Sequence, residues 1–214
     1  MKKRLAILAA GILATIQLNA QHPVTQNQRL RLLVGTYTEN TPAEGIYLYS
    51  YDPETADTQL LSVAPSGNPS FVVASTDGAR AYAVNEFNDG RQAVSAFTLT
   101  ANSIELINTI PIPKEEFNGE DPCNILYDGK TVITSNYTGG SLTAFALAPG
   151  GGILGYTQWF SSGVEYTHVL TGEKTDTEPA HMHCAVVSPD GKYYFVTNLG
   201  NDCIHRFEDR KSVV

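Results

Sequence analysis

Two histidines stand two residues apart in His181-Met182-His183, with Cys184 directly after them and an apolar run behind. Imidazole accepts and donates protons near neutral pH, because its ordinary pKa is about 6.5, and it is also a common metal ligand. The pair therefore indicates acid–base chemistry or metal binding, unless it only begins a strand. Side chains two apart on a strand share a face. We expect His181 and His183 to project together, with Cys184 turned the other way.

Metal binding would need a third ligand, usually from another strand. His168 and His205 are available, but neither stands at a spacing typical of a metal site, and the chain has no CxxC motif. We therefore expect no metal and no other cofactor. The cysteines are odd in number (Cys123, Cys184 and Cys203). A disulfide and free or buried thiols are equal alternatives for an exported protein, and the sequence assigns no pair.

A repeated pattern identifies the elements that hold the histidines. It reads NPSFVVASTDGARAYAVN in residues 68–85, DPCNILYDGKTVITSN in 121–136 and HMHCAVVSPDGKYYFVTN in 181–198. Each copy has an Asp-Gly pair and, at a fixed distance after it, an asparagine: Asn85, Asn136 and Asn198. Asp-Gly between β-branched and aromatic runs predicts a hairpin, because glycine accepts the positive φ of a tight turn.

The repeat predicts an all-β protein, a β-propeller. The asparagines lie 51 and then 62 residues apart, and repeats of about 40–50 residues, each a small antiparallel sheet, are typical of propellers. A β-sandwich, the alternative, does not predict a recurring turn-to-asparagine distance. The longer second interval contains a polar insertion, EYTHVLTGEKTDTEP, that we expect in a loop. Residues 21–208 then hold roughly three to four blades of an incomplete propeller.

Both ends of the sequence differ in pattern from the repeats, and neither is expected to belong to the folded domain. Residues 1–20 combine a basic start, a short apolar run and a small residue at the exit, which predicts a secretory signal peptide rather than a retained anchor. We expect an exported protein, periplasmic or secreted. Residues 209–214, DRKSVV, match the translated start of a common sequencing adapter. We expect this tail to be non-native and the natural chain to continue beyond Glu208.

The formal net charge is −8 at pH 7, and it becomes more negative without the leader. An acidic surface argues against nucleic acid and anionic membranes as partners. We expect no membrane association after the signal is cleaved. Residues 114–121, KEEFNGED, are predicted to be a solvated acidic loop.

The order of motifs resembles one family. GTYT with GIYLYSYD, NPSF with STDG and YAVNE, DPCN with SNYTGGSL, and HMH with SPDG and VTNLGND follow one another as in the lactonase family of seven-bladed β-propellers. That family includes propeller-type 6-phosphogluconolactonases and carboxymuconate lactonising enzymes. The resemblance covers residues 32–208 and implies that the first strand of each blade lines a central channel, with the active site at one mouth.

The resemblance implies a set of site residues. His181 and His183 match the family's His-x-His step, and Glu86 with Asn85 matches the Asn-Glu ending of YAVNE. Asn136 and Asn198 occupy the equivalent point of their own blades, where they bind substrate or, alternatively, stabilise the turn. The family's arginine belongs to a later blade that this sequence does not include. We therefore expect a chain of this length to be inactive.

The implied reaction is the opening of a sugar lactone by water, as in a 6-phosphogluconolactonase-like hydrolase. Histidine suits both the attack of water and the protonation of the leaving alkoxide. We expect His183 to be the general base, His181 to orient the substrate or its carbonyl oxygen, and Glu86 to bind hydroxyl groups or position a histidine. Two alternatives remain: a muconate-type lactonising cycloisomerase, and a non-catalytic propeller that binds a glycan or a protein.

Overall fold

The computed structural model describes four stretches of the chain: residues 29–161, 166–167, 174–175 and 179–209. The predicted signal peptide lies outside the described residues, as does the predicted tail after Asp209. Among the described residues, no helix is long and apolar enough to cross a membrane.

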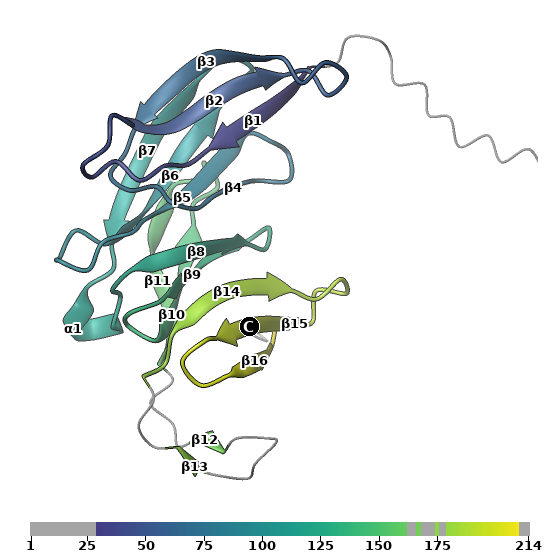
Figure 1. Ribbon diagram of the computed structural model, residues 1–214. Coiled ribbons are helices and arrows are strands. Elements are labelled where there is room, and N and C mark those ends of the chain that lie inside the picture. Colours follow the sequence, from purple (N-terminus) through teal and green to yellow (C-terminus); the bar gives the residue numbers. More distant parts are fainter. Residues whose placement is uncertain (1–28, 162–165, 168–173, 176–178, 210–214) are drawn as a thin grey trace, which may run out of the picture.

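Antiparallel sheets follow one another along the chain and form successive blades (Figure 1). The first blade has three strands: β1 (Leu30–Val34), β2 (Gly45–Tyr51) and β3 (Thr58–Pro65). The second has four: β4 (Val72–Ala74), β5 (Arg80–Asn85), β6 (Ala93–Leu99) and β7 (Ile104–Pro111). The third also has four: β8 (Pro122–Tyr127), β9 (Thr131–Asn136), β10 (Ser141–Leu147) and β11 (Ile153–Ser161). The last has three: β14 (Met182–Val187), β15 (Tyr193–Asn198) and β16 (Cys203–Glu208). The predicted all-β partial propeller is confirmed.

Two short elements stand between successive blades in the sequence. A hairpin of β12 (Tyr166–Thr167) and β13 (Lys174–Thr175) forms within the predicted insertion. The helix α1 (Lys114–Phe117) stands where the sequence predicted a solvated loop, and that prediction is wrong. Phe117 is buried in the core between the second and third blades, which draws the segment inward.

The blades pack face to face through apolar side chains. Along β5, Ala81 and Ala83 join the core shared with the first blade, whereas Tyr82 and Val84 join the core shared with the third. Successive side chains of a strand point to opposite faces of its sheet. A strand between two neighbouring blades is therefore apolar on both faces, which explains the unbroken apolar runs of the repeat.

The Asp-Gly pairs form the predicted turns. Gly78, Gly129 and Gly191 all have positive φ, at 66°, 97° and 70°. The aspartate before each glycine accepts backbone N–H groups of the same turn, as Asp77 does from Ala79 at 2.9 Å. Each turn joins the first strand of its blade to the second, so the repeat fixes where the inner strands begin and end.

Asp128, the turn aspartate of the third blade, also binds the next blade. The Tyr194 hydroxyl donates to its Oδ2 at 2.6 Å, and the hydroxyl and backbone N–H of Thr131 donate to its carboxylate at 2.8 and 2.7 Å. Burial acts to raise the pKa of Asp128, but these hydrogen bonds outweigh it and hold the pKa below its ordinary value. Such a carboxylate stabilises the fold above its unfolded pKa of about 3.9, and the contribution is lost as pH falls through the lower folded pKa.

Removal of the Tyr194 hydroxyl is expected to weaken this link between blades. Tyr194→Phe should lower the free energy of unfolding by about 1–2 kcal/mol at pH 7, the range for a partly exposed hydrogen bond to a charged group. Because Asp128 is protonated at low pH, the difference from wild type should shrink below pH ~3.9. Urea unfolding at pH 7 and pH 3 measures both values. Tyr193→Phe is the control, since its hydroxyl has no hydrogen bond to a described residue, and an equal loss in both variants would contradict the prediction.

Candidate functional site

One position of the repeat lies at the start of the inner strand in three successive blades. It is occupied by Ser70, Cys123 and His183. In β8 and in β14 the pairing register shifts across this residue, so Cys123 and His183 each sit at a bulge. A bulge re-aims the side chain of the extra residue. The Cys123 Sγ atom consequently lies 3.8 Å from His183 Nδ1, although the two residues belong to different blades.

The residue that follows the repeated asparagine is a second position of interest. Its side chain contacts the residue at the first position. In the second blade it is Glu86, whose Oε2 accepts a short hydrogen bond from the Ser70 hydroxyl. In the third blade it is Tyr137, whose ring contacts both His181 and His183. The candidate site is therefore built from two positions of the repeat, where the first strand of a blade begins and the second ends.

His181 is held by contacts on several sides. Its ring stacks on that of Tyr137, with centroids 4.4 Å apart and planes 10° apart, and its Nδ1 lies 3.0 Å from the Tyr137 carbonyl oxygen. Its backbone N–H donates to Asn198 Oδ1 at 2.8 Å, and its carbonyl accepts from the backbone N–H of Leu199 at 2.9 Å. The half-buried imidazole is thus fixed in position and in ring plane.

His183 is more exposed, and its surroundings are different. Its ring meets the Tyr137 ring edge-on, with centroids 5.5 Å apart. Burial, reinforced by the negative charge of Glu86, raises the pKa of the neighbouring Cys123 thiol to about 12. Cys123 is therefore a neutral thiol at physiological pH rather than a nucleophilic thiolate. A surface pocket of about 290 Å³ is lined by His183 and by residues of β15 and β16, among them Thr197 and Ile204.

The expected strand alternation does not hold across the histidine pair. His181 precedes β14, which begins at Met182, and the register shift at His183 breaks the period of two. Met182 is fully buried between blades, and Cys184 is half-buried. The two imidazoles still converge, because both contact the Tyr137 ring, His181 in a parallel stack and His183 at 83° to it.

Glu86 is oriented by two hydroxyl groups. Tyr37 Oη donates to Glu86 Oε2 at 2.9 Å, and Ser70 Oγ donates to the same oxygen. Desolvation and the neighbouring carboxylate both raise the pKa of Tyr37, so its hydroxyl remains a donor at neutral pH. Because both donors converge on Oε2, the other oxygen, Oε1, accepts no hydrogen bond from the described residues and can accept one from a ligand.

The repeated asparagines lie inside the blades. Asn85 Nδ2 donates to the Gly67 carbonyl at 2.7 Å, and the fully buried Asn136 donates to Ser141 Oγ at 2.8 Å. The Asn198 amide binds the backbone of His181, as described above. These contacts favour the structural role, and substrate binding by the three asparagines stays a prediction.

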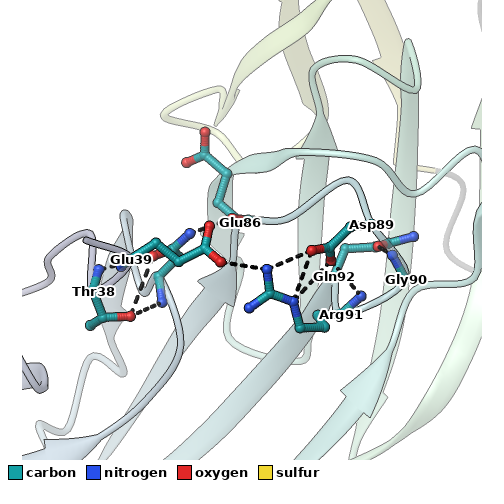
Figure 2. A network of polar contacts seen from close by, with 8 residues as sticks. Thr38, Glu39, Glu86, Asp89, Gly90, Arg91 and Gln92 are labelled. Carbon is teal, nitrogen blue, oxygen red and sulfur yellow. Dashed lines mark hydrogen bonds and ion pairs between the residues drawn. The ribbon is translucent and has the colours of Figure 1, made fainter. Parts of the chain in front are cut away.

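The loops beside Glu86 carry a network of charges (Figure 2). The Arg91 guanidinium contacts the carboxylates of Glu39 and Asp89 and lies 3.9 Å above the Phe87 ring centroid. The network ties the loop after β1 to the loop after β5. The charge of Arg91 is already matched by two carboxylates.

The described residues contain no group of three or more His, Cys, Asp or Glu side chains arranged to hold a metal ion. His205 lies 3.2 Å from Asn198 Nδ2 and 3.4 Å from Cys203 Sγ, within the last blade. His168 lies outside the described residues. In the described part of the chain, Cys123, Cys184 and Cys203 are all free thiols.

Sequence reasoning missed Tyr37, Ser70, Cys123 and Tyr137. A signal for three of them was present, since Ser70 and Cys123 align with His183, and Tyr137 aligns with Glu86, once the repeat copies are superposed. Tyr37 precedes the first complete copy of the repeat, and no comparable signal marks it.

Comparison with known proteins agrees with this architecture. A curated 6-phosphogluconolactonase from Formosa agariphila is 31% identical over 186 residues, which are 83% of this chain and 49% of that protein. A Bacteroides fragilis structure provisionally assigned as a 6-phosphogluconolactonase superposes with a TM-score of 0.74 at 35% identity, over 87% of this chain and 50% of that one. A periplasmic gluconolactonase from Pseudomonas aeruginosa, at 24% identity and a TM-score of 0.68 over 83% of this chain and 49% of that one, shares the fold.

The chain spans about half the length of these proteins. The sequence profile described as "Lactonase, 7-bladed beta-propeller" matches residues 31–213, a range that runs from β1 through β16 in the described part of the chain. The repeat, the face-to-face blades and this match agree, and the chain belongs to the lactonase family of seven-bladed β-propellers.

Proposed function

We propose that the complete protein carrying these blades is a hydrolase that opens a sugar lactone by histidine-assisted attack of water on the ring carbonyl. The observation that carries the proposal is the convergence of His181 and His183 on Tyr137, beside Cys123, whose thiol senses the charge of the oriented Glu86. The names of the similar 6-phosphogluconolactonases support the substrate class.

In the proposed reaction, a histidine nitrogen takes a proton from water as the water oxygen attacks the lactone carbonyl carbon. The carbonyl electron pair moves to oxygen, and the resulting oxyanion needs a hydrogen-bond donor. When the intermediate collapses, the ring C–O bond breaks and the leaving alkoxide takes the proton from the imidazolium. One imidazole and one water account for every proton, and the second imidazole is free to donate to the oxyanion.

The oriented carboxylate suits recognition of the sugar hydroxyls. Glu86→Gln should raise KM by about tenfold, which corresponds to the loss of roughly 1.4 kcal/mol of a hydrogen bond to a charged acceptor. The change in kcat should be smaller than threefold, because the hydroxyls are remote from the bond that breaks. Steady-state kinetics measure both, with the exposed Glu105 on β7 as the control in Glu105→Gln. A fall in kcat with KM unchanged would instead place Glu86 at the reacting atoms.

An unphosphorylated aldonolactone is the proposed substrate. The predicted export signal and the acidic net charge both disfavour a phosphorylated intermediate. Arg91, the cation in the loop beside Glu86, is already bound to two carboxylates (Figure 2). The proposed location is the periplasm or the exterior of the cell.

Hydrolysis of gluconolactone and of its 6-phosphate, each corrected for the rate in buffer, tests the proposal. The expected result is acceleration of both or of the unphosphorylated lactone alone. Formation of a lactone from an unsaturated diacid, without hydrolysis, would favour the cycloisomerase. Absence of any acceleration would favour a propeller that binds a glycan or a protein.

The same assay compares the complete protein with a chain of 214 residues. We propose that residues 21–208 are the N-terminal part of a longer propeller and that residues 209–214 are not native. The shorter chain should leave the lactone at its buffer rate, because the arginine implied by the family resemblance would be missing. Full activity of the shorter chain would overturn this domain assignment.

A further inference from the structure

We propose that His181 is the general base, acting through Nε2, and that Tyr137 is the positioning residue that sets its tautomer and ring plane. The inference rests on the proposed function for its catalytic consequence. It differs from the expectation drawn from sequence, which favoured His183.

The tautomer follows from the partner of Nδ1. The Tyr137 carbonyl oxygen, 3.0 Å from His181 Nδ1, only accepts hydrogen bonds. Nδ1 must therefore carry the proton of the neutral ring, and Nε2 is left with a lone pair. No contact of Nε2 with a described residue competes for that lone pair. His181 is thus prepared to accept a proton before any substrate binds.

The same carbonyl supports the charged form. When Nε2 takes a proton from water, the ring becomes an imidazolium and its Nδ1–H group becomes a stronger donor. The carbonyl oxygen of Tyr137 stabilises that positive charge in the way that a carboxylate orients the histidine of a hydrolase triad. The Tyr137 ring, parallel to the imidazole at 4.4 Å, keeps the donor in line.

The Tyr137 backbone is itself held in place. Its N–H donates to the Asp121 carbonyl at 2.8 Å, and its carbonyl also accepts the N–H of Gly140 at 3.2 Å. The bond from Gly140 closes the four-residue turn between β9 and β10, and the bond to Asp121 ties that turn to the start of β8. The turn therefore holds the Tyr137 carbonyl group in the position where it contacts His181 Nδ1.

Among the residues that the structure describes, His183 has no comparable orienting partner. Its Nδ1 faces a neutral thiol at 3.8 Å, and its ring lies at 83° to the ring of Tyr137 instead of stacking on it. The exposed imidazole of His183 can therefore reorient, which suits it to donate a hydrogen bond to the oxyanion as the oxyanion forms.

Nitrogen NMR of the complete protein labelled with ¹⁵N-histidine tests the tautomer without reference to activity. The His181 signals are identified by their loss in His181→Gln. At pH 8 we expect the pattern of a protonated Nδ1 and a bare Nε2, the reverse of the tautomer that free histidine prefers. A protonated Nε2 in the wild-type protein would overturn the inference.

Variants at Tyr137 test positioning. Tyr137→Leu retains the carbonyl but removes the stacked ring, so we expect kcat to fall about tenfold with KM little changed and the two His181 tautomers to become mixed. Tyr137→Phe keeps the ring and should restore most of kcat and the single tautomer. Unchanged kcat and nitrogen shifts in Tyr137→Leu would contradict the positioning role. Confirmed tautomers in a protein that opens no lactone would refute the proposed function and leave the geometry standing.

Discussion

Replacement of His181 by alanine is expected to lower kcat for lactone hydrolysis by about 10²–10⁴-fold, the usual contribution of a general base. The loss should appear equally in kcat/KM, because the interaction with the water proton exists only in the transition state. Steady-state kinetics of the complete protein at neutral pH measure it.

His183→Ala is the matched comparison, and its expected loss is about tenfold, as for one donor to an oxyanion at an exposed position. The reverse order, with His183→Ala the more severe, would assign the base to His183. Equal and minor losses in both variants would contradict any role of the pair in proton transfer.

Gly140→Ala is expected to damage both stability and activity. Gly140 has a φ of 59°, and a Cβ atom there would lie 2.6 Å from the Ala180 carbonyl oxygen, next to His181. The left-handed conformation alone costs an alanine about 1–2 kcal/mol, and the collision adds to this by displacing residue 180. We expect a loss of more than about 2 kcal/mol in the free energy of unfolding, together with a fall in kcat.

Gly191 provides a closely matched control. Its φ is 70°, but a Cβ atom at Gly191 would meet nothing within 4 Å. Gly191→Ala should therefore show the conformational cost without the collision. Urea unfolding and kinetics of the two variants separate these effects. If Gly140→Ala were no worse than Gly191→Ala, the close approach of the turn to Ala180 would not matter.

The blades could be predicted from the sequence because several local signals agree. Asp-Gly turns, strands that are apolar on both faces and a recurring asparagine all define the same hairpin in each copy. The sequence also placed His181 and His183 at the start of the inner strand of the last blade. Each of these inferences depends on residues that are close together in the chain.

The finer geometry of the site depends on contacts between blades. Such contacts produce weaker patterns in the sequence than the local turns and strands do. The bulge at His183 arises from a two-against-one pairing with β15 that no local pattern announces. Tyr137 lies 44 residues before His181, and only packing of the third blade on the last brings them together. Likewise, the acidic segment around Phe117 forms a helix because the Phe117 side chain packs into the apolar core between the second and third blades.

The repeated asparagines stabilise the blades through their hydrogen bonds, which favours a structural role over a role in substrate binding. Each is buried in its blade and binds neighbouring strand or backbone groups. The residue that follows each asparagine lies just after the end of the strand, and its type differs between blades. It is a glutamate in the second blade and a tyrosine in the third. A constant framework of this kind lets neighbouring positions vary in chemistry without changing the fold.

The most direct test of the account is the rate of gluconolactone opening, measured by titration of the released acid at constant neutral pH. The complete protein, the same protein with His181→Gln and His183→Gln combined, and buffer alone are compared. We predict a rate well above buffer for the wild type and a return to the buffer rate for the double variant. A wild-type rate equal to buffer, or a double variant as fast as the wild type, would contradict it.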